Sequence, residues 1–461
     1  MLKMQREAIS RRSLLKGATA AAILQGINVR SETHRSDTPN VVVILADDLG
    51  YGDLSSYGAT DLETPNIDAL VSGGIRFNNF YANSPVCSPT RASILSGMYP
   101  DLAGVPGLVR THAYNNWGYL SQKAVLVPEM LKPAGYHSAI IGKWNLGLES
   151  PNTPTERGFD FFHGFLGDMM DDYYTHLRHG FNYMRKNLQV INPQGHATDI
   201  FTDWTIDYLN ERKQDGRNFF LYLAYNAPHV PIQPPEEWLK RVKEREPQLD
   251  ETRAKMVALI EHLDMSVGRV VERLKENGQF ENTLIVFTSD NGGELRAGAS
   301  CGSLRGGKED MYEGGIRVPM CALWPGHIAP GSSNNEVALA MDLVPTICQT
   351  AGVYPSGNLN GTSILPILET KANRLSARDL VWVRREGGMR YQGQDYYAFR
   401  RGNWKLLQNT PFESFRLYNL KEDPGEKTDL ASQEPQLYDD LIRTLMLHFQ
   451  QAGRVPWERP E

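Results

Sequence analysis

The sequence predicts an α/β protein with a large, mixed and mostly parallel sheet flanked by helices, plus a smaller C-terminal antiparallel α+β domain. Two apolar runs rich in β-branched residues, 40–48 and 282–293, read as buried parallel strands, and both end in acidic and amide residues. Segments with apolar residues spaced by three and four, at 200–213 and 254–277, have the pattern of helices. Strands that alternate with helices build an α/β sheet.

The first 38 residues precede the predicted fold. Arg11 and Arg12 lead into an alanine-rich apolar stretch that ends near residue 27 and is too short to cross a membrane. This order is typical of a twin-arginine export signal, and a polar linker follows it. We therefore expect residues 1–38 to be an export signal and linker, with the twin-arginine translocation machinery as a partner and a periplasmic or extracellular location.

The main domain is predicted at residues 39–360. It contains two further apolar strands, near 137–145 and 219–229. In open α/β sheets, ligands bind beyond the carboxyl ends of the strands. Six polar residues follow apolar strands and are therefore expected to converge there: Asp47, Asp48, Lys143, His229, Asp290 and Asn291.

Residues 361–461 are predicted to form the C-terminal subdomain, an antiparallel sheet with a helix. Residues 395–408 have the pattern of a hairpin that turns at 401–403, and residues 415–431 have that of a strand and a turn. An amphipathic helix at 434–452 completes this subdomain.

Composition and charge argue against several classes of protein. With 461 residues, the chain exceeds what one hydrophobic core usually supports, and 41% hydrophobic with 22% charged residues is an ordinary globular composition. The net charge of −6 argues against a nucleic-acid binder and a polybasic membrane surface. The four cysteines form no CxxC pair, so neither a zinc knuckle nor a disulfide scaffold is expected.

Four of the residues at strand ends offer oxygen ligands: Asp47, Asp48, Asp290 and Asn291. Such oxygens suit Ca²⁺ or Mg²⁺ rather than zinc. Paired aspartates alone often only cap a helix, but two acidic strand ends in matching context are a stronger signal. The sequence therefore predicts a site for a hard divalent cation.

The stretch SPVCSPTRASILSG at 84–97 contains the candidate nucleophile. Pro89 suits the first turn of a helix, which places Cys87 near the positive helix end, where an anion is favoured. Arg91, about one turn on, can point back to the same place. An arginine there suits a tetrahedral oxyanion such as sulfate or phosphate.

Three more residues add to the expected site. Lys143 and Lys308 lie beside glycines, where the backbone can approach a ligand closely. His229 lies in a proline-flanked loop, where it could act as a general acid. Each alone could be an ordinary solvated residue, but together they predict a metal ion and a cation cluster around one nucleophile, which suits cleavage of an anionic ester.

The segment CSPTR at 87–91, followed by ASILSG, resembles the signature C-x-P-S/T-R of type I, formylglycine-dependent sulfatases. The resemblance runs from Asn40 to the C-terminus through blocks in the family's order: PNVVVILADDLGYGDLSSYG, TPNIDAL, GYHSAIIGKWNLG, ERGFDFFHGF, SDNGG and LRGGKEDMYEGGIRVP. The chain is similar to arylsulfatases and N-acetylgalactosamine sulfatases, as a bacterial exported member. The resemblance implies an alkaline-phosphatase-like α/β sandwich with a small C-terminal antiparallel domain.

The resemblance also implies hydrolysis of a sulfate ester to the alcohol and inorganic sulfate. Cys87 would be oxidised to formylglycine by a formylglycine-generating enzyme, and a hydroxyl of the aldehyde hydrate would attack sulfur. Ca²⁺, with Mg²⁺ as an alternative, would bind formylglycine-87 and the four residues with oxygen ligands. Arg91 would hold the formylglycine hydroxyl. Lys143, His229 and Lys308 would bind the sulfate, and His229 or Lys308 would protonate the leaving alcohol.

One residue departs from the family pattern. The family block usually reads GKWHLG, but this chain has GKWNLG, with Asn145 in place of a histidine that contacts the formylglycine hydroxyl. An asparagine keeps a hydrogen bond but cannot take a proton near neutral pH. We therefore expect another group or a water molecule to assist the release of sulfate.

Two other functions stay open: a phosphonate or phosphodiester hydrolase with the same nucleophile signature, and an exported anion- or glycan-binding protein without catalysis. The resemblance and the predicted export favour a sulfated carbohydrate or polysaccharide as substrate. The aromatic and histidine-rich stretch 167–183 is either an outer subsite, with His176, Arg178 and His179 as substrate contacts, or an ordinary surface loop.

Overall fold

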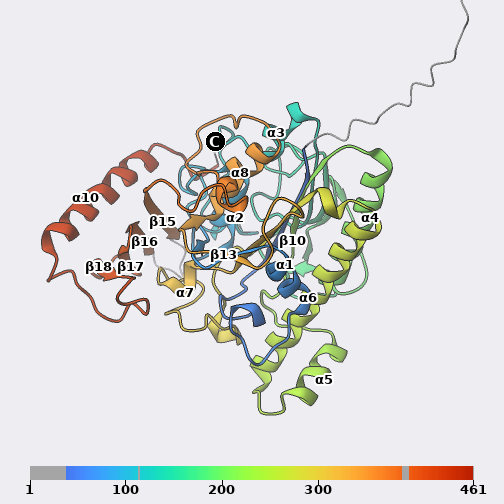
Figure 1. Cartoon of the computed structure of the whole chain (residues 1–461), viewed down its shortest axis with the longest axis horizontal. Helices are drawn as coiled ribbons and strands as arrows, with labels where there is room; N and C mark the ends of the chain where they lie inside the picture. Colours follow the sequence, from blue (N-terminus) through green and yellow to red (C-terminus); the bar gives the residue numbers. More distant parts are fainter. Residues whose placement is uncertain (1–37, 113–114, 387–393, 460–461) are drawn as a thin grey trace, which may run out of the picture. The chain divides into compact units, whose positions relative to one another are not determined.

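A ten-stranded sheet lies at the centre of this computed structural model, which describes residues 38–112, 115–386 and 394–459 (Figure 1). Its strands are β1 (Asn40–Ala46), β2 (Ile75–Phe77), β4 (His137–Lys143), β5 (Phe161–Phe165), β8 (Met184–Lys186), β9 (Gln189–Val190), β10 (Phe219–Ala224), β11 (Thr283–Ser289), β12 (Met320–Leu323) and β13 (Ser332–Asn334). They lie in the order β13-β2-β12-β11-β1-β10-β4-β5-β8-β9. The predicted export signal lies outside the described residues.

Five adjacent strands in the middle of this sheet, β11, β1, β10, β4 and β5, run parallel. The register aligns their carboxyl ends, since Ala46 of β1 pairs with Ser289 of β11, and Ala224 of β10 pairs with Gly142 of β4. β12 pairs with β11 in the antiparallel direction, so the sheet is mixed. The residues that follow the parallel strands therefore meet at one edge of the sheet.

Helices cover both faces of the sheet (Figure 1). One face packs against α1 (Pro65–Gly73), α4 (Ala197–Asp215) and α6 (Glu251–Glu276), and the other against α2 (Cys87–Ser96), α3 (Val127–Leu131) and α8 (Leu343–Thr350). Successive residues of β1 alternate between the two cores, with Val41 and Val43 on the second face and Val42 and Ile44 on the first. This alternation over a wholly buried strand explains its unbroken apolar sequence.

The C-terminal part forms a four-stranded antiparallel sheet in the order β15-β16-β17-β18. Its elements are β15 (Asp379–Glu386), β16 (Gln394–Arg401), β17 (Trp404–Gln408), β18 (Arg416–Asn419) and α10 (Pro435–Ala452). Arg401 pairs with Trp404, so the hairpin turns where the sequence indicated. Leu441 and Leu445 of α10 are buried in the core of this sheet. The predicted fold class is confirmed, while the boundary between residues 360 and 361 stays a prediction.

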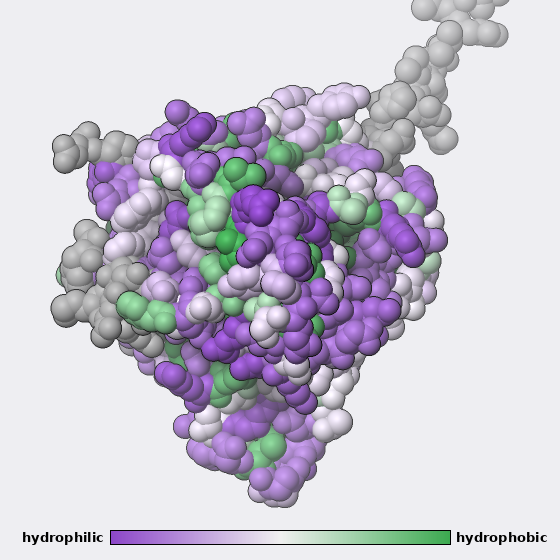
Figure 2. Space-filling view, turned by 90° about the vertical axis from the view of Figure 1, so that its left-hand side faces the viewer, coloured by the Kyte–Doolittle hydropathy of each residue, from purple (hydrophilic) through white to green (hydrophobic). Residues whose placement is uncertain are grey.

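Short elements connect the main ones. They are β3 (Phe80–Tyr81), β6 (Leu177–Arg178), β7 (Phe181–Asn182), β14 (Ala338–Leu339), α5 (Glu236–Arg245), α7 (Glu313–Ile316) and α9 (Leu365–Leu368). The face drawn in Figure 2 is mainly hydrophilic, with hydrophobic side chains in small groups among the polar ones. Within the described ranges, no helix combines the length and the apolar character needed to cross a bilayer.

Candidate active site

The carboxyl ends of the parallel strands bring the predicted polar residues together. Asp47 and Asp48 follow β1, and Asp290 and Asn291 follow β11; all four are buried. The backbone N–H of Asp48 donates to Asp290 Oδ1 at 3.2 Å, and Asn291 Nδ2 donates to Asp48 Oδ1 at 2.8 Å. Asp48 has a φ of 67°, a left-handed conformation that aspartate tolerates better than most residues. The two strand ends are therefore linked into one acidic cluster.

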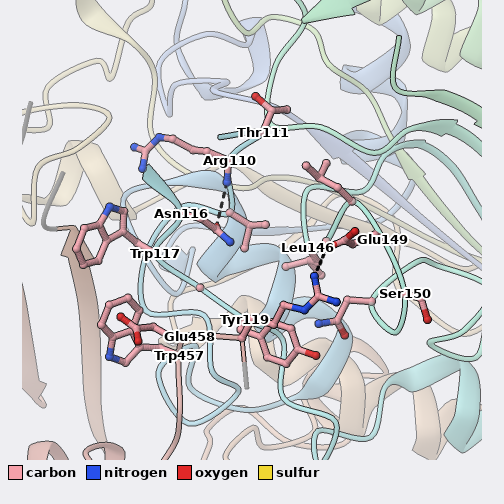
Figure 3. Close-up of a pocket in the computed structure, with 16 residues that line it drawn as sticks. Arg110, Thr111, Asn116, Trp117, Tyr119, Leu146, Glu149, Ser150, Trp457 and Glu458 are labelled. Carbon is pink, nitrogen blue, oxygen red and sulfur yellow. Dashed lines mark hydrogen bonds and ion pairs between the residues drawn. The ribbon is translucent and has the colours of Figure 1, made fainter. Parts of the chain in front are cut away.

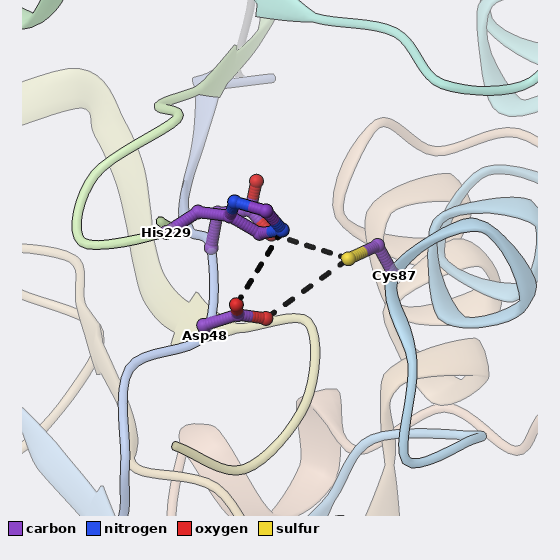
Figure 4. Close-up of side chains that lie close together, drawn as sticks. Asp48, Cys87 and His229 are labelled. Atoms are coloured by element: carbon purple, nitrogen blue, oxygen red, sulfur yellow. Dashed lines mark hydrogen bonds and ion pairs between the residues drawn. The ribbon is translucent and has the colours of Figure 1, made fainter. Parts of the chain in front are cut away.

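Cys87 is the first residue of α2 and faces this acidic cluster (Figure 4). Its Sγ lies 3.4 Å from Asp47 Oδ1 and 4.0 Å from Asp48 Oδ1. Burial, and next the carboxylate of Asp47, raise the pKa of the Cys87 thiol well above its ordinary value. The thiolate is the reactive form of cysteine, so an unmodified thiol at this position is a poor nucleophile.

Arg91 lies one turn along α2 and joins the two acidic strand ends. Its Nη2 is 2.7 Å from Asp290 Oδ2 and 3.4 Å from Asp47 Oδ1, and its Nε donates to Asp290 Oδ2 at 2.9 Å. Nη1 donates to the carbonyl of Lys143 at 3.3 Å. A fully buried guanidinium with these partners fixes the carboxylates and the end of β4 relative to α2.

Two lysines contact the acidic cluster from different segments. Lys143, the last residue of β4, donates from Nζ to Asp47 Oδ2 at 2.5 Å. Lys308 donates from Nζ to Asp48 Oδ2 at 2.6 Å. Burial alone would raise the pKa of Asp47, but the positive charges of Lys143, Arg91 and Lys308 outweigh burial and lower it. Asp47 is therefore held ionised by its neighbours.

His229 is oriented by its own backbone loop. Its Nδ1 lies 2.6 Å from the carbonyl oxygen of Val230, which can only accept, so Nδ1 carries the hydrogen. Its Nε2 then accepts from Lys308 Nζ at 3.1 Å. Burial, and next the charge of Lys308, lower the pKa of His229, so this imidazole is neutral in the cluster. The two candidate acids are His229 and Lys308, and the proton between Nε2 and Nζ is bound to Lys308.

The donors at this edge fit a hard divalent cation. Three carboxylates and the amide of Asn291 supply oxygens, and Asn291 Oδ1 is buried without a hydrogen-bond partner. Ligand atoms of Asp47, Asp48, Cys87 and His229 lie within 4.8 Å of one another. The charges of the three carboxylates are balanced by those of three cations, Arg91, Lys143 and Lys308. A divalent cation would therefore leave a net positive site, which favours an anionic ligand.

A model of the sulfatase family matches residues 39–353, and a model of the C-terminal region of N-sulphoglucosamine sulphohydrolase matches residues 307–453. The chain belongs to the sulfatase family.

Similar proteins include human N-acetylgalactosamine-6-sulfatase, 32% identical over 91% of this chain and 81% of that protein. Human arylsulfatase A is 34% identical over 92% of this chain and 85% of that protein. The crystal structure of Ps i-CgsB in complex with k-i-k-neocarrahexaose has a TM-score of 0.84 at 31% identity, over 92% of this chain and 95% of that one. This sulfatase therefore shares both sequence and fold with sulfatases over most of its length.

Asn145 is the residue at which the sequence departs from the expected family block. Asn145 is buried, and its φ of 56° is left-handed. Its Nδ2 donates to the carbonyl of Val109 at 2.7 Å, while Oδ1 has no hydrogen-bond partner. Asn145 therefore offers a hydrogen-bond acceptor.

The stretch 167–183 separates into a buried and a surface part. His176 is 1% exposed and its Nε2 lies 3.0 Å from the carbonyl of Gly195, so its ring does not face solvent as a substrate contact requires. Arg178 pairs with Asp171 at 2.8 Å. The His179 ring is 4.4 Å from that of His112. The roles of Arg178 and His179 as substrate contacts stay predictions.

Tyr173 is a supporting residue that sequence reasoning did not single out. Its hydroxyl lies 2.8 Å from the carbonyl oxygens of both Asn226 and His229, so it holds the loop that carries His229. A tyrosine in a loop rich in tyrosines gives no sequence signal for this contact. Its partners lie more than fifty residues further along the chain.

A second group of possible metal ligands, His196, Asp199 and His262, lies apart from the acidic strand ends. His196 Nδ1 accepts from the N–H of Thr198 at 3.2 Å, and its Nε2 lies 3.0 Å from the carbonyl of Gln233. Both ring nitrogens of His196 are therefore engaged in hydrogen bonds. This group reads as a cap of α4 rather than as a metal centre.

Proposed function

We propose that this sulfatase hydrolyses the sulfate ester of a sulfated carbohydrate through a formylglycine at position 87, with a calcium ion at the acidic strand ends. The observation that supports this most is the convergence of Cys87, four residues with oxygen ligands and two lysines at one buried edge. Conversion of the Cys87 thiol, whose pKa is raised, would supply a better nucleophile at this edge.

The chain's own residues would divide the remaining work. When bound, Ca²⁺ would lie among Asp47, Asp48, Asp290 and Asn291 and supply Lewis-acid charge at the ester. When formed, formylglycine hydrate would supply the attacking hydroxyl. The side chains of the protein would then bind the ester oxygens and deliver a proton to the leaving group.

Lys143 and Lys308 would hold the ester oxygens and balance the negative charge that develops on them. Lys308 would give its proton to the leaving alcohol, since Nε2 of His229 faces it as an acceptor. Arg91 would keep the metal-side carboxylates in place. Arg91 is thus a positioning residue in this proposal.

The substrate is proposed to be a galactose-based sulfated glycan. Similarity to N-acetylgalactosamine-6-sulfatase and to the protein crystallised with neocarrahexaose supports this class. The twin-arginine export, the periplasmic or extracellular location and the formylglycine-generating enzyme as a maturation partner are proposed from the sequence alone.

The first test is the mass of the tryptic peptide 77–91 from protein produced together with a formylglycine-generating enzyme. We expect an aldehyde in place of the Cys87 thiol, and sulfate release from sulfated neocarrahexaose that stops with a chelator and returns with Ca²⁺. An unmodified thiol, beside a known sulfatase that is converted in the same cells, contradicts the proposal and favours a glycan-binding protein. Faster turnover of a phosphonate monoester or a phosphodiester than of any sulfate ester also contradicts it.

A further inference from the structure

A cavity of about 570 Å³ lies beside the candidate active site, between three segments that are distant in the sequence (Figure 3). Its walls come from residues 109–111 and 116–119, from 146–150 and 152, and from the C-terminal residues 457–459. This volume is within the range of small-molecule sites in proteins, about 300–1,000 Å³. The cavity is therefore large enough to bind part of a substrate.

One wall of this cavity is hydrogen-bonded to Asn145 and to Ser88. The N–H of Val109 donates to Ser88 Oγ at 2.9 Å, and Ser88 directly follows Cys87. The carbonyl of Val109 accepts from Asn145 Nδ2 at 2.7 Å. Leu146, next to Asn145 in the chain, also lines the cavity. The cavity wall is therefore joined by hydrogen bonds to Asn145 and to the residue that follows the proposed nucleophile.

Aromatic rings form one side of the cavity, as Figure 3 shows. The rings of Trp117 and Trp457 are stacked with their centroids 5.1 Å apart and their planes 19° from parallel. Tyr119 lines the same space. Among the lining residues, Trp117 Nε1 and Thr111 Oγ1 are buried and lack a hydrogen-bond partner. The cavity thus combines apolar ring surface with polar lining residues such as Asn116.

Both arginines that line this cavity already form ion pairs. Arg459 forms an ion pair with Glu149, and Arg110 forms one with Glu386 at 2.5 Å. The lining residues include two arginines, Arg110 and Arg459, and two glutamates, Glu149 and Glu458. In the active site, in contrast, Lys143 and Lys308 lie where the proposed Ca²⁺ and the sulfate ester would both bind. Binding of a sulfate group in this cavity would compete with the existing ion pairs.

We propose that this cavity is a subsite for a sugar ring without sulfate, next to the sulfated unit of an oligosaccharide. Sugar rings have an apolar face of C–H groups that packs on aromatic rings and an edge of hydroxyls that bind polar groups. This subsite rests on the proposed function, because it assumes a glycan at the active site. The C-terminal residue Trp457 is then part of substrate recognition.

The test compares Trp117→Ala, Trp457→Ala and a chain that ends at Arg454 with the wild type. The substrates are sulfated neocarrahexaose and the small ester 4-nitrophenyl sulfate. We expect the ratio of the two kcat/KM values, hexasaccharide over aryl sulfate, to fall about tenfold in each variant, as for other buried aromatic contacts. Tyr354→Ala, which removes a tyrosine that is 98% exposed, is the matched control and should keep the ratio.

A calorimetric titration on the unconverted protein separates this inference from the proposed function. We expect sulfated neocarrahexaose, or its form desulfated at one unit, to bind the wild type about tenfold more tightly than the Trp457→Ala variant, whether or not sulfate is released. Equal affinities, or an unchanged ratio in folded variants, overturn the subsite. Failure of sulfate release together with weaker binding by the variant overturns only the proposed reaction.

Discussion

This sulfatase contains two buried groups of charged residues, and the groups differ in the partners that their polar atoms contact. The active-site cluster joins Asp47, Asp48 and Asp290 to three cations at the carboxyl ends of the strands. The second group, here called the C-terminal ion cluster, consists of Glu313, Lys405 and Glu426. Lys405 Nζ lies 2.9 Å from Glu313 and 2.8 Å from Glu426, and the N–H of Glu313 donates to Glu426 at 2.7 Å.

The active-site cluster has buried amide acceptors that face no partner, whereas both carboxylates of the C-terminal ion cluster contact Lys405. Asn291 Oδ1 and Asn145 Oδ1 are buried acceptors without partners, whereas Glu426 Oε1, which also makes no hydrogen bond, lies 2.8 Å from Lys405 Nζ. Left-handed backbones occur in both places, at Asp48 and Asn145 and at Glu426. Unsatisfied groups and unusual backbone conformations gather where a protein binds ligands. Lys405 instead ties β17 to α7 and to the turn after β18. The comparison teaches that neither buried charge nor a left-handed backbone marks a site by itself, while buried acceptors that face neither a hydrogen-bond donor nor a cation do.

The same substitution in both clusters tests this difference, with the largest effects that we expect. Lys143→Met should lower kcat on a sulfate ester by about 10²- to 10³-fold, because it removes a charge at the reacting group. Lys405→Met should lower the free energy of unfolding by about 3–5 kcal/mol, because two carboxylates lose their buried partner. The activity per folded molecule should change little in Lys405→Met. Urea unfolding and steady-state kinetics measure the two effects.

Arg401→Ala is the control within the C-terminal sheet. Arg401 pairs with Asp379 at 2.7 Å, but it is 39% exposed, and exposed ion pairs contribute about 0–1 kcal/mol. If Lys405→Met lost catalysis as strongly as Lys143→Met while remaining folded, the C-terminal ion cluster would have a catalytic role. The distinction between the two clusters would then be wrong.

The fold and the acidic strand ends could be predicted because local signals determine them. An unbroken apolar run followed by Asp47 and Asp48 signals a buried parallel strand, and the aligned register of β1 and β11 brings Asp290 beside them. The hairpin at Arg401 could likewise be predicted from the local turn residues Gly402 and Asn403.

Contacts between distant segments could not be predicted in the same way. Trp117 and Trp457 are 340 residues apart in the sequence, and no spacing rule relates them. His176 lies in a stretch whose composition is typical of a binding loop, but its ring is buried against Gly195. Only the packing of the folded chain determines this burial. Such features depend on how loops fold over the sheet edge rather than on periodicity.

A smaller effect is expected in the pH dependence of stability. Burial would raise the pKa of Glu313, but Lys405 and two arginines outweigh burial and lower it from 4.5 to about 2. A lowered pKa means that Glu313 stabilises the fold fully above pH 4.5, and that this contribution is lost as the pH falls from 4.5 to 2. Glu313→Gln should therefore flatten the fall of the unfolding free energy across this range, measured by urea unfolding at each pH.

Glu426→Gln is the matched variant with the opposite sign. Burial, outweighing Lys405, raises the pKa of Glu426, so this carboxyl favours the fold most when it is protonated at low pH. Its removal should make the acid-side loss of stability steeper rather than flatter. Identical slopes in both variants would show that the two carboxyls share one titration instead of having separate roles in the C-terminal ion cluster.

The smallest effect that we expect concerns Asn145, the acceptor left over at the active site. Asn145→Ala should lower the steady-state kcat about tenfold, the value of one lost hydrogen bond in a buried site. Asn145→His should leave the first turnover similar and leave or raise the steady-state rate, because histidine can also take a proton and tolerates the left-handed backbone. Rapid-quench measurement of the first turnover separates the two phases. Wild-type behaviour of Asn145→Ala in both phases would mean that its free oxygen has no part in the release of sulfate.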